Sequence, residues 1–189
     1  MFKKAESPYG ETKQLCEKMI EDSNLFSVSL RYFNPIGSHE SGLIGDRSAD
    51  KPANLVPIIC EVASGKRDKL IINGSDYKTK DGSCVRDYIH VEDLATAHIN
   101  ALDYCIKNRS KSVFNIGTGQ GLSVFETIRI FEEVNNIKLN FEIGPRRNGD
   151  VAEIYSDTKK SRKYLKWKAK RTVKEALKSA WNWEIKKNI

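Results

Sequence analysis

The 189-residue sequence has little of what membrane, secreted and zinc-binding proteins require. No apolar run approaches the ~20 residues of a membrane-spanning helix, and Met1 to Glu6 lead into no signal-peptide core. The four cysteines and three histidines are scattered, without a CxxC pair or a histidine at ligand spacing. We therefore expect a soluble, cytoplasmic protein with reduced thiols, and neither a disulfide framework nor a metal site.

The composition gives no sign of wholesale disorder, and its charge excess is modest. Hydrophobic residues make up 39%, and 32 Lys and Arg against 25 Asp and Glu leave a net charge of +7. Most of the surplus follows residue 157, where basic residues alternate with aromatic and apolar ones at helical spacing. This pattern favours a solvated helical face over a nucleic-acid surface, so we expect no nucleic-acid partner.

The stretch from Ser7 to Lys13 could carry chemistry. Ser7 suits a helix cap and Pro8 the first helical position, which predicts a helix running to about Glu21. Tyr9 and Lys13 would share one face of that helix, and the Lys13 ammonium could stabilise a phenolate that acts as a base. The same pair also arises by chance on solvated helices, so both interpretations stay open.

A β-rich segment from Phe26 to Phe33 follows and should end at Asn34 and Pro35, because proline cannot donate to a strand ladder. Ligands of open α/β sheets bind at the carboxyl ends of strands, which places Tyr32, Phe33 and Asn34 at a candidate site. The alternative is a buried aromatic residue and a turn asparagine. Residues 38–52, rich in Gly, Ser and Asp, are expected to form a long loop.

Two further segments could bind phosphate. Residues 85–91 alternate in polarity, which would put Arg86 and Tyr88 on one face of a strand, unless that face is merely solvated. Residues 145–150 combine two arginines with Asp150, as a diphosphate clamp with a ribose acceptor would, although basic loops also serve solubility. Asn54 is placed to cap a helix over 55–63, and Asn73 with Gly74 indicates a turn after a short strand.

The glycines at 117, 119 and 121 resemble only superficially a dinucleotide-binding fingerprint. Leu122 stands where the third glycine or alanine should be, and the residues Ser123 to Glu126 match a capping box. We therefore expect these glycines to turn the chain into a helix.

Four motifs occur in a specific order: Ser7-Pro8-Tyr9-Gly10 with Lys13, residues 31–35, residues 81–91 and residues 145–150. Together they resemble the UDP-glucose 4-epimerases of the extended short-chain dehydrogenase/reductase superfamily, from Ser7 to about Trp183. The resemblance implies an α/β fold: the C-terminal part of an NAD-binding Rossmann-type domain plus a smaller α/β substrate-binding domain. Residues 1–36 would supply the last helix and strand of the Rossmann-type domain. Residues 37–189 would be mainly UDP-sugar-binding, with short returns to the Rossmann-type domain.

The activity that the resemblance implies is the NAD-dependent interconversion of UDP-glucose and UDP-galactose, a reaction of galactose metabolism. Tyr9 would take the proton of the sugar 4-hydroxyl while hydride passes to NAD, and the 4-keto sugar would rotate before hydride returns. Lys13 would also hold the nicotinamide ribose, with Tyr32 and Phe33 against the cofactor. The implied UDP-sugar residues, with Arg86 and Arg147 clamping the diphosphate, are Asn34, Asn54, Leu55, Ile71, Ile72, Asn73, Arg86, Tyr88, Arg147, Asp150 and Ile154.

The sequence departs from that family in two respects. The 189 residues include neither the strand with a GxxGxxG turn nor the serine or threonine upstream of the tyrosine, so we expect the chain to correspond to the C-terminal half of such an enzyme, without the N-terminal dinucleotide-binding half. We expect this chain alone to bind NAD weakly or not at all, to be inactive, and to aggregate through an exposed sheet edge, whereas the complete enzyme would be a homodimer. Ile154 is neither the largest nor the smallest residue for a position that contacts the sugar, which leaves acceptance of UDP-N-acetylhexosamines open.

Two alternative functions remain. The first is a non-catalytic remnant that binds UDP-sugars without redox chemistry. The second is a nucleotide-sugar dehydratase or uronate epimerase with the same Tyr-Lys pair, against which the stretch from Asp81 to Val91 favours the 4-epimerase.

Overall fold

A computed structural model describes residues 7–47 and 52–187 of the chain. The elements are α1 (Pro8–Asp22), β1 (Val28–Tyr32), β2 (Asn34–Ile36), α2 (Leu55–Ala63), β3 (Leu70–Asn73), β4 (Val85–Arg86), β5 (Tyr88–His90), α3 (Val91–Asn108), β6 (Ser112–Ile116), β7 (Leu122–Ser123), α4 (Val124–Asn135), β8 (Phe141–Gly144), β9 (Glu153–Ile154), the π-helix η1 (Ser161–Leu165) and α5 (Val173–Lys186). The α/β class predicted from the sequence is confirmed. The predicted loop over 38–52 is confirmed for residues 38–47, and its residues 48–51 lie outside the described part.

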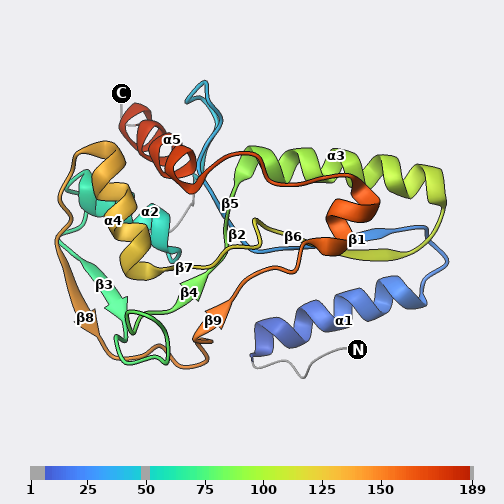
Figure 1. The fold of residues 1–189 in the computed structure, drawn as a ribbon, viewed down its shortest axis with the longest axis horizontal. Coiled ribbons are helices and arrows are strands. Elements are labelled where there is room, and N and C mark those ends of the chain that lie inside the picture. Colours follow the sequence, from blue (N-terminus) through green and yellow to red (C-terminus); the bar gives the residue numbers. More distant parts are fainter. Residues whose placement is uncertain (1–6, 48–51, 188–189) are drawn as a thin grey trace.

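One part of the molecule is built on the parallel pair β1 and β6. Their register runs from Val28 beside Ser112 to Tyr32 beside Ile116. In Figure 1, α3 lies above this pair and α1 below it. The buried apolar residues of this part come mainly from α3, β6 and the segment around η1; they are Ile89, Leu94, Ala97, Ala101, Phe114, Ile116, Leu165 and Trp167.

The second part gathers α2, α4 and α5 around short strands, at the other end of the view in Figure 1. Here β3 pairs in parallel with β8, and β4 lies between β7 and β9. Its core includes Ile59, Leu70, Ile72, Phe131 and Leu177, all at most 2% exposed. The capping box predicted at Ser123 is confirmed, because its side chain accepts from Glu126 N and the Glu126 carboxylate accepts from Ser123 N.

Pro35 does not end strand pairing, so that part of the prediction was wrong. It lies inside β2, which pairs in parallel with β5. The Asn34 N–H donates to the Asp87 carbonyl at 2.9 Å. Successive residues of a strand direct their N–H groups to opposite sides, so a proline is tolerated where its missing donor faces away from the partner strand.

The predicted alternating strand over 85–91 is also wrong, because the chain changes sheet at Asp87. Val85 and Arg86 belong to β4, whereas Tyr88 to His90 form β5 and pair with β2. Tyr88 is 4% exposed and packs in the core, while the Arg86 side chain remains at the surface with 17% exposure. The two side chains therefore do not share a solvent face. Burial raises the pKa of the Tyr88 hydroxyl to about 12.

The helix predicted from Ser7 and Pro8 is confirmed as α1. Ser7 Oγ accepts from Gly10 N at 3.2 Å, and Pro8 occupies the first turn. Although α1 carries Leu15, Met19 and Ile20, it has no buried residue. Within residues 7–47 and 52–187, β1 pairs only with β6, so its other edge is unpaired. This side of the molecule consequently exposes both apolar side chains and strand hydrogen-bonding groups.

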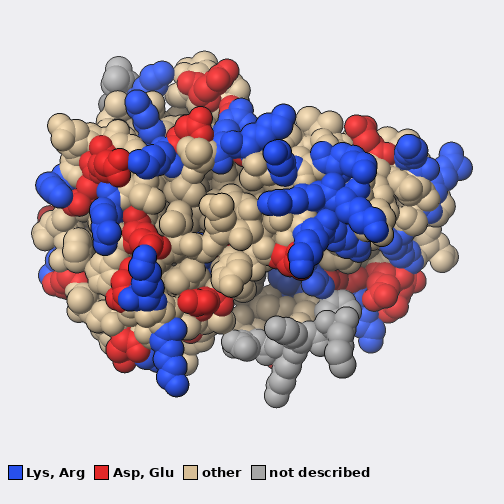
Figure 2. Space-filling model, viewed as in Figure 1, with Lys and Arg blue, Asp and Glu red and all other residues tan. Residues whose placement is uncertain are grey.

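Lys and Arg side chains gather on the right of the space-filling view, over the part of the molecule that Figure 1 draws with α3 and η1 (Figure 2). Its exposed basic residues include Lys159, Lys160, Arg162, Lys163, Lys166 and Lys168. None of the helices formed by residues 7–47 and 52–187 is long and apolar enough to cross a membrane.

Candidate functional site

Tyr9 and Lys13 lie together in the first turns of α1, as the sequence predicted. Lys13 Nζ is 5.2 Å from the centre of the Tyr9 ring, so the ammonium lies over the aromatic face. The Tyr9 side chain is exposed, with 71% of its surface accessible. The described residues thus bring a phenol and an ammonium together at a surface that is open to a ligand or to further protein.

Tyr32, Phe33 and Asn34 occupy the junction of β1 and β2. Tyr32 is 53% exposed and its ring lies 6.3 Å from that of His98, while the Phe33 amide donates to the Ile116 carbonyl. Asn34 is exposed, and its backbone N–H donates to the backbone carbonyl of Asp87. The alternative of a buried aromatic residue does not describe Tyr32, which is exposed at the carboxyl end of its strand.

Arg86 and Asp150, far apart in sequence, form an ion pair. Arg86 Nη2 is 3.4 Å from Asp150 Oδ1, and Arg86 Nη1 donates to the carbonyls of Val85 and Val151 at 2.8 and 2.7 Å. Ile154, 45% exposed, lies beside Arg86 in the pairing of β4 with β9. Three of the residues predicted for the UDP-sugar are therefore neighbours in space.

The two arginines of the turn after β8 are in different situations. Arg146 is bound to Asp76, with Nε 2.7 Å from Oδ1, and its guanidinium lies 4.4 Å from the centre of the Tyr77 ring. This pairing lowers the pKa of the Asp76 carboxyl. Arg147 is exposed, and its carbonyl accepts from Asp150 N at 3.2 Å in the same turn. The turn therefore keeps Arg147 close in sequence and space to Asp150.

The other predicted residues occupy two places. Ile71 is 40% exposed whereas Ile72 is 2% exposed, because successive strand residues point to opposite faces, so Ile72 could meet a ligand only through its backbone. Asn73 ends β3 and is exposed. Asn54 is the N-cap residue of α2, as predicted, and Leu55 is the first helical residue, but the Asn54 side chain makes no capping hydrogen bond.

Sequence reasoning missed one residue at this site, Asp87. It is fully buried, and its carboxylate accepts from Thr118 N and Oγ1, Gly119 N, and Ser156 N and Oγ. The available signal was an aspartate among the alternate apolar positions Val85, Ile89 and Val91, because a buried charge requires several donors. The same bonds explain the Gly117 to Gly121 segment, whose amides at Thr118 and Gly119 face a carboxylate instead of a phosphate.

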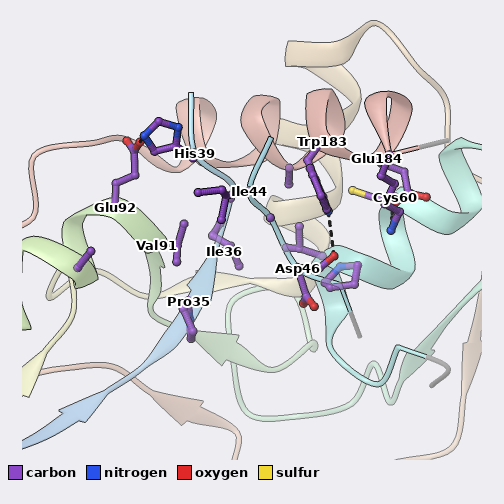
Figure 3. Close-up of a pocket in the computed structure, with 17 residues that line it drawn as sticks. Pro35, Ile36, His39, Ile44, Asp46, Cys60, Val91, Glu92, Trp183 and Glu184 are labelled. Carbon is purple, nitrogen blue, oxygen red and sulfur yellow. Dashed lines mark hydrogen bonds and ion pairs between the residues drawn. The ribbon is translucent and has the colours of Figure 1, made fainter. Parts of the chain in front are cut away.

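An apolar cavity of about 420 Å³ lies elsewhere, between β2, α2 and α5 (Figure 3). Its walls include Ile36, Val56, Cys60 and Trp183. The polar groups at its edge bind one another: His39 and Glu92 are 3.5 Å apart, Glu184 binds Lys66 and Lys187, and Trp183 Nε1 donates to the Asp46 carbonyl. Its described lining includes no predicted site residue, and it has no converging polar groups suited to a diphosphate.

The donor set of the described residues fits only part of NAD. Tyr9, Lys13 and Tyr32 are exposed groups suited to a ribose and a ring, but the amides of Thr118 and Gly119, the nearest match to a phosphate cradle, are bound to Asp87. The described residues contain no cluster of three His, Cys, Asp or Glu side chains that could hold a metal ion.

Comparisons with known proteins agree with this geometry. Residues 2–180 match the protein-family model described as GDP-mannose 4,6 dehydratase. The chain is 45% identical over 185 residues to the UDP-glucose 4-epimerase of Pasteurella multocida, covering 95% of this chain and 55% of that protein. It is 42% identical over 185 residues to the UDP-glucose 4-epimerase of Bacillus subtilis, with the same two coverages.

Solved structures give the same picture. The fold superposes with a TM-score of 0.93, at 40% identity, on the UDP-glucose 4-epimerase of Stenotrophomonas maltophila with bound NAD and formylated UDP-arabinopyranose, covering 96% of this chain and 56% of that one. On the UDP-glucose 4-epimerase of Bifidobacterium longum in complex with NAD+ and UDP, the fold superposes with a TM-score of 0.92 at 39% identity. This match covers 100% of this chain and 57% of that one. The chain thus spans a little over half the length of the relatives that it matches.

Proposed function

Because the chain belongs to the family described as GDP-mannose 4,6 dehydratase, and is similar over almost its whole length to UDP-glucose 4-epimerases, we propose that it carries the UDP-sugar site and the Tyr-Lys pair of an NAD-dependent 4-epimerase. The proposed reaction interconverts UDP-glucose and UDP-galactose. The chain spans only part of its relatives, so we propose that it binds UDP-sugars without turning them over alone.

The observation that carries this proposal is the proximity of Arg86 and Asp150. A guanidinium presents several donors to phosphate oxygens, and a carboxylate beside it accepts from ribose hydroxyls. Arg147, exposed in the adjoining turn, can reach the same ligand. Ile154 beside Arg86 would then meet the sugar, and its intermediate size is compatible with both plain and N-acetylated hexoses.

Tyr9 and Lys13 have distinct roles in the proposed chemistry. The Tyr9 phenolate takes the proton from the sugar 4-hydroxyl and returns it after the 4-keto sugar has turned. Lys13 holds the phenolate charge by its position over the ring and also binds the nicotinamide ribose. NAD supplies the hydride acceptor when bound, and Tyr32 and Phe33 would flank it. A homodimer and a cytoplasmic location of the complete enzyme are part of the same proposal; the four free cysteines suit a reducing compartment.

Calorimetric titration of the chain with UDP tests the proposal. UDP should bind, and Arg86→Gln or Arg147→Gln should each weaken binding at least tenfold, because hydrogen bonds to charged groups contribute roughly 1.5–3 kcal/mol. The matched control is Arg146→Gln: this neighbouring guanidinium is engaged with Asp76, so its loss should change UDP affinity less than twofold. Absence of UDP binding to the unmodified chain would refute the proposal.

The second candidate is a dehydratase or related enzyme acting on another nucleotide sugar, which the description of the matching family model favours. Titration with GDP under the same conditions separates the two. We expect UDP to bind more tightly than GDP; the reverse order would support the second candidate. Turnover of UDP-galactose by the chain alone, with added NAD, would show that it is not a binding unit only.

A further inference from the structure

We infer that Asp87 is a positioning residue for the proposed UDP-sugar site: its carboxylate fixes segment 150–156 against Arg86, and so sets the geometry of the diphosphate clamp. This inference rests on the proposed function. Asp87 is 0% exposed and cannot touch a ligand, so it would act only through the residues that it holds.

Asp87 joins the segments that carry the predicted ligand residues. Its backbone carbonyl accepts from Asn34 N at 2.9 Å, and Arg86 precedes it directly in the chain. Its side chain accepts from Ser156 N at 3.1 Å and Ser156 Oγ at 2.6 Å, two residues beyond Ile154. One residue thus contacts or adjoins β2, β4 and the end of β9.

The pairing of β4 with β9 is short and gains an anchor from these bonds. It consists of Val85 beside Glu153 and Arg86 beside Ile154, with one further bond from Val85 N to the Ala152 carbonyl at 2.8 Å. The Ser156 bonds to Asp87 continue the attachment at the carboxyl end of β9. Because the Arg86 guanidinium donates to the Val151 carbonyl and pairs with Asp150, a shift of this segment would move both Arg86 and Asp150.

The same carboxylate also holds the loop after β6: its Oδ1 accepts from Thr118, and its Oδ2, which accepts from Ser156, accepts from Gly119 N as well. Thr118 Oγ1 donates at 2.5 Å, and the amides of Thr118 and Gly119 donate at 2.9 and 3.0 Å. A Cβ atom on Gly117 would collide with Asp87 Oδ2 and Ser156 Oγ, so the loop approaches as closely as glycine allows. All five partners of the carboxylate are donors, which an acceptor-only ionised carboxylate satisfies.

Two single hydroxyl deletions test the inference. Ser156→Ala removes the 2.6 Å bond on the side of segment 150–156, and Thr118→Val removes the 2.5 Å bond on the side of the loop, which carries no predicted ligand residue. Ser156→Ala should weaken UDP binding at least fivefold and uridine binding by clearly less, since uridine keeps the ribose that would meet Asp150 but lacks the diphosphate that would meet Arg86. Thr118→Val should change both less than twofold.

Equal losses for the two variants, or equal losses of UDP and uridine, would show a merely structural role and overturn the inference. A ligand-free measurement keeps this result separate from the proposed function. Hydrogen exchange of the Val85 amide, which bonds to Ala152, should accelerate in Ser156→Ala and in Asp87→Asn but not in Thr118→Val. Unchanged Val85 exchange in Ser156→Ala would refute the inference even if UDP did not bind.

Discussion

At the scale of single residues, two buried aspartates hold irregular segments to regular ones. Asp87 binds the loop after β6 and the end of β9. Asp93, 1% exposed in the first turn of α3, accepts from the amides of Lys170 and Arg171 and from the Arg171 guanidinium at 2.8–2.9 Å. Several hydrogen-bond donors take the place of water around each buried carboxylate. These bonds fix the position of the segments that supply the donors.

His90 gives a pH-dependent prediction at the same scale. Burial lowers its pKa below the ordinary 6.5, and Arg171 lowers it further, while Glu92, Asp93 and Glu175 act in the opposite direction. The neutral ring accepts from Glu92 N through Nδ1, which caps α3, and faces Ser179 Oγ through Nε2. Between the folded and unfolded pKa values, only the unfolded chain binds the proton. The stability is therefore present above pH 6.5 and lost as the pH falls below it.

In the unmodified chain, we expect the urea concentration at the midpoint of unfolding to decrease as the pH is lowered from 7.0 to 5.5. His90→Asn, which keeps a capping side chain but does not titrate, should flatten this dependence. His98→Gln is the control: His98 is exposed and bonds within its own helix to the Leu94 carbonyl, so the pH dependence should persist. An equal slope in His90→Asn and the unmodified chain would contradict the prediction.

At the scale of elements, two helices begin with the same device in different surroundings. Ser123 and Thr172 each form a capping box, with Glu126 on α4 and Glu175 on α5. Ser123 is 2% exposed and also donates to Asp81, whereas Thr172 is exposed. The hydrogen bonds from Ser123 and Ser83 lower the pKa of the Asp81 carboxyl against the effect of its partial burial.

Ser123→Ala should therefore destabilise the chain more than Thr172→Ala. We expect losses of about 2 kcal/mol and about 1 kcal/mol respectively, because both lose a cap but only the first also removes one of the buried donors to Asp81. Urea unfolding of the two variants at pH 7 measures the difference. A larger loss for Thr172→Ala would mean that the Ser123 contact with Asp81 contributes nothing.

At the scale of the whole molecule, one side exposes apolar side chains together with an unpaired strand edge. The helix α1 exposes Leu15 and Met19 at 61% and 73%, and the free edge of β1 lies on the same part of the molecule. Soluble proteins rarely expose both a strand edge and a group of large apolar side chains without a partner. The relatives that the chain matches are nearly twice as long, which is consistent with further protein covering this side.

We predict concentration-dependent self-association of the chain, measured by light scattering on a gel-filtration column. Replacing Leu15 and Met19 together by glutamate should shift the population toward monomer without lowering the melting temperature, because neither side chain is buried. Lys18→Glu on the same helix changes the net charge equally and leaves the apolar surface intact, so it should not have this effect. A monomeric peak for the unmodified chain would count against the prediction.

The sequence determined the features that depend on residues three or four apart. Ser7 with Pro8, and Ser123 with Glu126, specify where α1 and α4 begin, because a cap satisfies backbone groups within one turn. The ordered motifs likewise sufficed to indicate the family. Tyr9 and Lys13 were predicted to meet because one turn of helix separates them.

Only the tertiary structure decided how distant segments share the site. The chain from Val85 to His90 changes sheet at the buried Asp87, so the polarity pattern placed Tyr88 on the wrong face. Pro35 fits into β2 because the position of its missing N–H donor faces away from the partner strand β5. Arg86 meets Asp150 through a pairing across 64 residues. Local propensities contain no information on such pairings, because their free energy comes from donors and charges that folding alone brings together.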